Sequence, residues 1–514
     1  MSKNTKSRIV GAALTLVGIG VILLPVWLLW PNFFHSLWSF IRAGWIIFIP
    51  FAVLMFLGWA LLDRNGRKTE TSGASIAAWS VGVIYLITAP FILNYFQLAS
   101  ISQSVVISEE SPSKMSFRDR APFDVAAATS SRALGNTTGD SNGNMRSLSV
   151  LGDNGEYSTA VIRRGFLKGY ESVQMLDIPL FGTADVNNVS FCKFSEEANL
   201  RFGGSMPTNS LTSAIARKVP LGTKAKSTDA VLVCEGEGEN AVPMVYAPLT
   251  VQKGFAVTKR VPAGVAIYNG KTGELVIEKN YTGKMPVYPQ SVAQKQRESM
   301  KASSGFDDWV FGRSGFEDTS KDESDPNGDN RAEFGLANGE GTKQLYVTPL
   351  NSRGTSSSIV AVGTVEATTL EGGKLNEYTV RVYPDNEVRQ ANSSIADTIT
   401  AGALGGYQAQ GLTVFEVVPN KDGNWIATIG RKQSILYRAT VEPNGTVTLR
   451  DANGKQVGKV VTPGVDVEEL PAEEGTENIP VQSDSVSTMT DEELKNLGNQ
   501  VLQELANRAT AAKQ

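Results

Sequence analysis

Three uncharged apolar segments occupy most of the first hundred residues. They cover residues 9–30, 43–62 and 75–98, and none of them contains a charged side chain. A run of about 20 apolar residues, rising about 1.5 Å per residue, crosses the hydrocarbon core of a bilayer, which is about 30 Å thick. A cleaved signal peptide would have a shorter apolar region, with no further spans behind it. The pattern therefore predicts three transmembrane helices.

Beyond residue 98, apolar and polar positions alternate in short runs, which is typical of β-strands. The runs end at Gly, Pro or Asn, and YNGKTGEL (268–275) resembles a hairpin tip, where Asn-Gly accepts a positive φ. We expect two mainly β units at residues 115–285 and 343–462, joined by a helical and acidic connector at 286–342. Helices within this region are predicted at 209–219, 288–303 and 391–404.

The C-terminal part of the chain changes character twice. Residues 463–489 are acidic and rich in Ser and Pro, with few large apolar side chains, so we expect a disordered linker. Residues 490–512 then show helical periodicity, and Thr490 with Glu493 is spaced as a capping box. The apolar face of this amphipathic helix is formed by Leu494, Leu497, Val501 and Leu505. We expect it to dock on a protein partner or on this protein; self-association and a solvent-exposed helix are the alternatives.

Basic residues beside the apolar runs predict the orientation, because positively charged residues stay on the cytoplasmic side of short loops. They gather in the tail 1–8 and in the loop 63–74, as Lys3, Lys6, Arg8, Arg64, Arg67 and Lys68. The loop between the first two runs contains only Arg42. We therefore expect a multi-pass protein of the cytoplasmic membrane, with a cytoplasmic N-terminus and a large extracytoplasmic C-terminal region. The opposite orientation would export two basic loops.

The predicted fold class is a membrane-anchored α+β protein: three N-terminal transmembrane helices, a mainly β extracytoplasmic region of two units, and a C-terminal amphipathic helix. The formal net charge is −4, although the first 74 residues hold seven basic and two acidic side chains. The remainder is net acidic, which argues against nucleic-acid binding. The expected partners are the lipid bilayer and a protein. No Asp, Glu or Lys lies within the apolar runs, where pumps usually need one.

Cys192 and Cys234 are the only cysteines, and both lie in strand-like runs. In an oxidising extracytoplasmic space they would form one disulfide. The alternative is two buried thiols in neighbouring strands. A zinc site is not expected, because two cysteines without accompanying histidines supply too few ligands.

The chain has a single histidine, His35, between the first two apolar runs. A Ser-His-Asp or Cys-His device beyond residue 98 is thereby excluded, because no imidazole is present to act as the base. A serine–lysine acyl enzyme needs no histidine, and the chain contains SPSK (111–114) and KTG (271–273). Pro112 follows Ser111, however, and KTG lies in the predicted hairpin tip, so we interpret both matches as coincidence. No cofactor is expected.

Acidic residues offer two further candidate sites. Asp325, Asn327 and Asp329 have the spacing of a calcium loop, but Asn330 and Leu336 replace the Gly and Glu that such a loop needs. A solvated acidic loop is the expected alternative to a looser cation site. Asp307 and Asp308 stand beside aromatic residues, where they either serve a carboxylate hydrolase or begin a helix whose aromatics pack inward.

Three functional hypotheses follow from these patterns. The first is a non-enzymatic anchored protein whose β-rich region binds another protein or organises an envelope assembly. The second is a carboxylate-based cell-wall glycoside hydrolase, which requires two facing acids in a groove. The third is an accessory subunit or sensor of a membrane transport complex, working through its spans by polar contacts such as those of Ser80 or Thr88.

Overall fold

The computed structural model describes residues 24–64, 73–134 and 139–460, apart from short internal segments of which the longest are 319–332 and 400–410. Most of the first apolar run, the acidic linker 463–489 and the helix predicted at 490–512 lie outside this range. The same holds for the docking residues Leu494, Leu497, Val501 and Leu505 and for Lys3, Lys6, Arg8, Arg67 and Lys68. These remain predictions.

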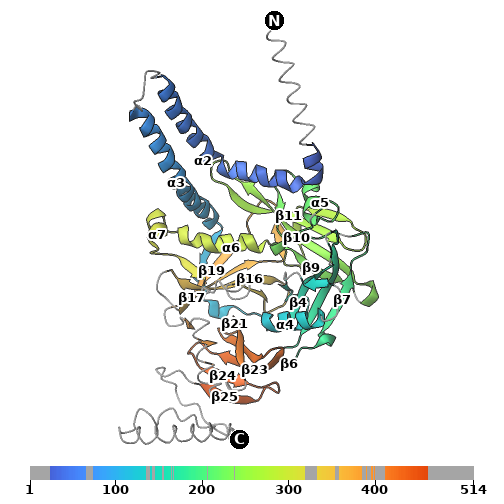
Figure 1. Ribbon diagram of the computed structural model, residues 1–514. Coiled ribbons are helices and arrows are strands. Elements are labelled where there is room, and N and C mark those ends of the chain that lie inside the picture. Colours follow the sequence, from blue (N-terminus) through green and yellow to red (C-terminus); the bar gives the residue numbers. More distant parts are fainter. Residues whose placement is uncertain are drawn as a thin grey trace, which may run out of the picture. The chain divides into compact units, whose positions relative to one another are not determined.

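The protein combines two long apolar helices near the N-terminus with a mainly β region that follows them. The helices are α2 (Pro31–Arg64) and α3 (Gly73–Ser102), and both are long and apolar enough to cross a membrane. They pack antiparallel: the Ser75 hydroxyl donates a 3.1 Å hydrogen bond to the Gly58 carbonyl, and the Tyr85 hydroxyl donates to the Ile46 carbonyl. Figure 1 shows them side by side, projecting away from the strands.

Helix α2 begins earlier than expected. Residues 31–42, predicted as a loop, are helical and continue without interruption into the second apolar run. Pro31 occupies the first position, where its missing N–H costs nothing. Figure 1 shows the first part of α2 lying across the β region, whereas the second part turns away to run beside α3. The first part of α2 therefore contacts the β region, whereas its second part contacts α3.

The first strand after α3 belongs to the largest sheet. It has seven strands in the order β1-β19-β17-β16-β14, with β15 also on β16 and β20 also on β17. The strands are β1 Val105–Ser108, β14 Phe316–Asp318, β15 Phe334–Ala337, β16 Gln344–Ser352, β17 Ser358–Glu366, β19 Tyr378–Val382 and β20 Arg389–Gln390. β1 pairs in parallel with β19, so the end of the helical hairpin is built into a sheet edge.

Two five-stranded sheets share a core. One has the order β12-β11-β10-β8 with β9 on β10, and the other the order β2-β4-β5-β7 with β3 on β4. The strands of the first are β8 Lys224–Ala225, β9 Val231–Glu235, β10 Val242–Lys253, β11 Lys259–Asn269 and β12 Leu275–Glu278. Those of the second are β2 Gly139–Ser141, β3 Arg146–Ser147, β4 Gly155–Arg163, β5 Tyr170–Ile178 and β7 Val189–Lys193. Buried Tyr170, Leu211 and Val245 join the two sheets.

The remaining strands tie the early and late parts of the chain together. A six-stranded sheet runs β21-β22-β23-β24-β25, with β6 on β23, and β13 pairs with β18. These strands are β6 Gly182–Thr183, β13 Asn280–Thr282, β18 Thr369–Glu371, β21 Thr413–Pro419, β22 Trp425–Arg431, β23 Ser434–Val441, β24 Val447–Arg450 and β25 Gln456–Val460. The chain up to Thr462 forms one compact unit, and the predicted division at 285 and 343 is not confirmed.

Short helices lie in the connections between the strands. The α-helices are α4 Phe123–Leu134, α5 Leu211–Lys218, α6 Gln290–Ser299 and α7 Phe306–Phe311. The 3₁₀ turns are η1 Pro112–Lys114, η2 Val186–Asn188, η3 Ser227–Asp229, η4 Gly238–Asn240 and η5 Met300–Ala302. α5 and α6 confirm the helices predicted at 209–219 and 288–303. α4 was not predicted, because its Ala, Ser and Thr residues give a weak periodic signal.

The hairpin tip between β11 and β12 has the predicted position but different turn chemistry. The side-chain oxygen of Asn269 accepts hydrogen bonds from the backbone N–H groups of Lys271 (2.8 Å) and Thr272 (3.1 Å). The positive φ, +75°, falls on Gly273 and not on the Asn-Gly pair. Asn269 thus serves as a side-chain acceptor that mimics a backbone turn.

Candidate functional site

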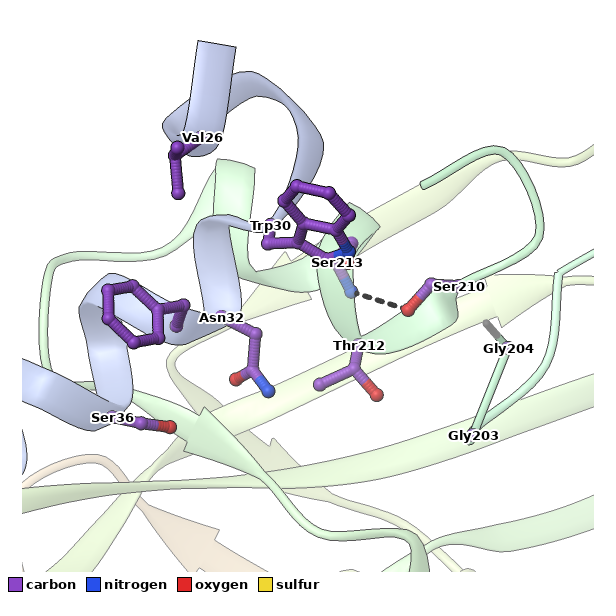
Figure 2. Close-up of a pocket in the computed structure, with 10 residues that line it drawn as sticks. Val26, Trp30, Asn32, Ser36, Gly203, Gly204, Ser210, Thr212 and Ser213 are labelled. Atoms are coloured by element: carbon purple, nitrogen blue, oxygen red, sulfur yellow. Dashed lines mark hydrogen bonds between the residues drawn. The ribbon is translucent and has the colours of Figure 1, made fainter. Parts of the chain in front are cut away.

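A pocket of about 570 Å³ lies between the start of α2 and the loop that precedes α5. Its volume falls in the range of about 300–1,000 Å³ that small-molecule sites occupy. One wall carries Val26, Trp30, Asn32, Phe33 and Ser36, and the other carries Gly203, Gly204, Ser210, Thr212 and Ser213. Figure 2 shows Asn32 and Thr212 extending into the space between the two walls.

The second wall depends on two glycines in a tight loop. Gly203 has φ of +70°, and a Cβ on Gly204 would lie 2.2 Å from the Asn209 carbonyl oxygen. Asn209 is buried, and its side-chain oxygen accepts a 3.0 Å hydrogen bond from the Met206 N–H. The Asn209 carbonyl in turn accepts from the Arg201 N–H at 2.9 Å. A side chain at Gly204 would therefore displace this wall, whereas one at Gly203 would strain the backbone.

Hydrogen bonds stabilise the second wall and join it to the first. Ser210 caps α5, its Oγ accepting from the Ser213 N–H at 3.2 Å, as Figure 2 shows. Arg217, near the other end of α5, donates to the Leu28 carbonyl at 2.8 Å. The start of α2 is held in turn by His35, whose Nδ1 donates to the Thr223 carbonyl at 2.8 Å. The pocket is therefore a preformed space.

The lining is amphipathic and uncharged. Val26, Trp30 and Phe33 offer apolar surface, whereas Asn32, Ser36 and Thr212 offer amide and hydroxyl groups. None of the ten lining residues that the structure describes is titratable. The pocket can therefore orient a neutral group that has both apolar and hydrogen-bonding parts.

His35 is fully buried in α2, and its ring stacks against Trp27 at 6.1 Å between centroids. Its Nε2 has no hydrogen-bond partner among the residues that the structure describes. Because Nδ1 must carry the proton that it donates to Thr223, the ring acts as a tether between α2 and the β region. The sequence placed this residue between the apolar runs but offered no signal for Thr223 as its partner.

The cysteines form the predicted disulfide. Cys192 in β7 and Cys234 in β9 are joined, with their Cα atoms 5.9 Å apart. The bond connects the two five-stranded sheets, which are not hydrogen-bonded to each other in the strand orders above. The disulfide therefore holds the two layers of one core together.

The residues of the two serine–lysine motif matches lie in two separate turns, where they form local hydrogen bonds. Ser111 caps η1, its Oγ accepting from the Ser113 N–H at 3.2 Å. Lys271 and Thr272 bind Asn269 in the hairpin tip through their backbone N–H groups. Each match to the acyl-enzyme pattern is therefore accounted for by turn chemistry.

Asp307 and Asp308 lie in the first turn of α7, which confirms the predicted helix start. The aromatics were expected to pack inward; Trp309 packs on Phe91, but Phe311 is exposed. Asp308 accepts a 3.0 Å hydrogen bond from the Ser314 hydroxyl. In the part of the chain that the structure describes, no group of three or more His, Cys, Asp or Glu residues could hold a metal ion. Asp325, Asn327 and Asp329 lie outside that part.

Two buried arginines form ion pairs that connect distant parts of the β region. Arg297 in α6 pairs with Glu333, 2.9 Å from Nη1, and with the half-buried Asp318, 3.1 Å from Nε. Arg120 bonds both carboxylate oxygens of Glu416, and burial raises the pKa of Glu416 despite this partner. Sequence patterns missed these pairs, because their partners are brought together only by the folded sheets.

Comparison of the chain with protein-family models, with curated proteins and with solved structures gave no match in any of the three.

Proposed function

We propose that this protein is a non-enzymatic integral membrane protein that presents its β-rich region on the outer side of the cytoplasmic membrane, to bind or organise another protein. The observation that carries the proposal is the junction between α3 and β1. α3 ends at Ser102 and β1 begins at Val105, already paired with β19. The helical hairpin is thus a fixed base for the β region.

Side-chain exposure supports a lipid environment for the hairpin. Phe56 on α2 is 62% exposed and Ile87 on α3 is 70% exposed. Large apolar side chains left in water cost roughly 1.5–3 kcal/mol each, and soluble proteins rarely expose many of them together. A bilayer would remove this cost.

The geometry of the hairpin, together with the basic residues predicted to be cytoplasmic, supports the proposed orientation. Arg64 and Gly73 end the helices at the far end of the hairpin from β1. A membrane crossed by both helices would therefore separate loop 63–74 from the β region. With the basic loop in the cytoplasm, the β region lies outside, where a disulfide is stable.

The amphipathic, uncharged lining of the described pocket is compatible with a binding role. The only histidine tethers α2, and no titratable side chain lines the described pocket. Binding of a protein partner needs no such group. The helix predicted at 490–512 is proposed as an additional docking element.

The test is protease digestion of spheroplasts beside lysed cells, with epitope tags at both ends of the full chain. We expect the C-terminal tag to be lost from intact spheroplasts while the N-terminal tag survives. Protection of the C-terminal tag until lysis would overturn the orientation. A protein recovered in the soluble fraction would overturn membrane anchoring itself.

A further inference from the structure

The first part of α2 has its amphipathic faces reversed relative to a water-exposed helix. His35 and Ser39, four positions apart, are buried toward the β region. Leu37, Phe40 and Ile41, on the opposite face, point outward, and Phe40 is 62% exposed. A surface helix in water buries its apolar stripe on the protein and exposes its polar residues. In the first part of α2, the apolar side chains lie on the exposed face, away from the β region.

The turn between β10 and β11 continues the same apolar surface. Phe255 in this turn is 80% exposed, the highest value among the large hydrophobic side chains that the structure describes. Its ring lies 4.8 Å from that of Trp45, whose Nε1 donates to the Phe255 carbonyl at 3.1 Å. Arg42 donates to the neighbouring Gly254 carbonyl at 3.1 Å. Phe255 is therefore held in an exposed position beside α2.

Helix α7 supplies a third apolar element. Its Trp309 packs on Phe91 of α3, with ring centroids 4.6 Å apart, and Phe306 packs on Tyr95 at 5.1 Å. These contacts place α7 against the part of α3 that leads into β1. Val310 and Phe311 remain exposed, Phe311 by 65%. Three elements distant in sequence thus expose apolar side chains where the helices meet the β region.

We infer that Leu37, Phe40, Ile41, Phe255, Val310 and Phe311 form an interfacial surface that inserts into the boundary between lipid headgroups and acyl chains. The first part of α2 would then lie in the membrane plane, and only its second part would cross. This inference rests on the proposed anchoring by α2 and α3 and extends it to the β region.

Continuity with the hairpin favours lipid over a protein partner. The surface begins on the same helix that continues into the second apolar run, so the bilayer that receives the hairpin reaches it directly. Trp38, Trp45 and Tyr95 are residue types that prefer the membrane interface. Arg42 and Arg313 stand beside the surface, and Arg313 lies over the Phe311 ring at 4.8 Å. The exposed carboxylate of Asp307 limits α7 to headgroup depth.

The test measures the depth of single sites in the full chain reconstituted into phosphatidylcholine–phosphatidylglycerol vesicles. Phe40, Phe255 and Phe311 are each replaced by Cys and labelled with an environment-sensitive fluorophore, the native cysteines being joined in the disulfide. Ile87→Cys reports on the span, and Leu436→Cys is the aqueous control, matched as an exposed apolar site on β23. Quenching by iodide is compared with quenching by lipids that carry a nitroxide near the headgroup.

We expect several-fold weaker iodide quenching at the three surface sites than at Leu436, together with strong quenching by the headgroup nitroxide. Iodide quenching equal to that at Leu436, with Ile87 still protected, would overturn the interfacial surface and leave the anchoring intact. Protection from both quenchers would mean that protein covers the surface, which also overturns the lipid assignment. Iodide access at Ile87 would overturn the anchoring on which the inference rests.

Discussion

The imidazole of His35 donates a 2.8 Å hydrogen bond from Nδ1 to the carbonyl oxygen of Thr223, 188 residues further along the chain. The bond joins the first part of α2 to the segment between α5 and β8. His35 and Thr223 are both buried, so water cannot easily take the place of either hydrogen-bonding partner if the bond is broken. The bond therefore controls how α2 sits on the β region.

Replacing His35 with Leu should destabilise the protein by about 1–3 kcal/mol, because it leaves the Thr223 carbonyl without its buried donor. His35→Asn is the matched control, since its amide nitrogen can stand in for Nδ1. Thermal unfolding of protein in nanodiscs measures both variants. Equal destabilisation by Leu and Asn would show that ring packing, including the contact with Trp27, matters more than the hydrogen bond.

Replacing Arg297 with Met should cost about 3–5 kcal/mol, because the carboxylate of Glu333, only 3% exposed, loses the buried guanidinium that it pairs with. Lys295→Met on the same helix removes an exposed pair with Glu298 and should cost no more than about 1 kcal/mol. Urea unfolding of the two variants gives the comparison. Similar midpoints for both would contradict a structural role for the buried pair, and Glu333→Leu added to Arg297→Met should recover part of the loss.

Reduction of the Cys192–Cys234 disulfide should lower the midpoint of thermal unfolding. The bond closes a loop with a sequence separation of 42 residues and should contribute about 2–4 kcal/mol by restricting the unfolded chain. The variant Cys192→Ser with Cys234→Ser should start at the lower midpoint and show no further response to dithiothreitol. A response of that variant to the reductant would mean that the effect lies elsewhere.

Alkaline pH should unfold the protein in part through Tyr378. Burial raises the pKa of Tyr378 from 10.0 to about 12. Between these values the unfolded chain loses the phenolic proton while the folded chain keeps it, so stability falls as pH rises from 10 to 12. Below pH 10 both states are protonated and the group contributes no pH dependence.

A pKa raised from 10.0 to about 12 corresponds to at most about 3 kcal/mol of stability. Tyr378→Phe should therefore move the alkaline unfolding midpoint upward, relative to the stability that the same variant shows near neutral pH. The alkaline unfolding midpoint is measured by tyrosinate absorbance together with circular dichroism. An unchanged alkaline midpoint would show that other groups govern the transition.

The sequence predicted the features that depend on local pattern. The apolar runs at 43–62 and 75–98 lie within α2 and α3, the alternating runs form strands, and Cys192 pairs with Cys234. It did not predict the helical character of residues 31–42, because a helix with its polar face turned to a protein resembles a mixed loop. The pairing of β1 with β19 was equally out of reach, since hydrogen bonds between distant strands leave no periodic signal.

The candidate pocket depends on the fold and could not be predicted from local sequence patterns. Asn32, Ser36 and Thr212 have no unusual spacing, and only the fold brings them to one space. Sequence patterns did not single out Gly203 or Gly204, because the role of Gly204 becomes visible only beside Asn209 in the fold. Sites made from uncharged residues of distant elements carry little signature in one sequence.

The parallel ladder from Val105 to Ser108 against Tyr378 to Arg381 has a mechanical consequence. A force directed along β1, between the helical hairpin and the β region, loads these hydrogen bonds in shear, so that they resist it together and do not open one after another. The junction is then stiff under tension. With the proposed anchoring, a pull on a bound partner would reach the bilayer as tilt or strain of α3, because the junction itself would extend little.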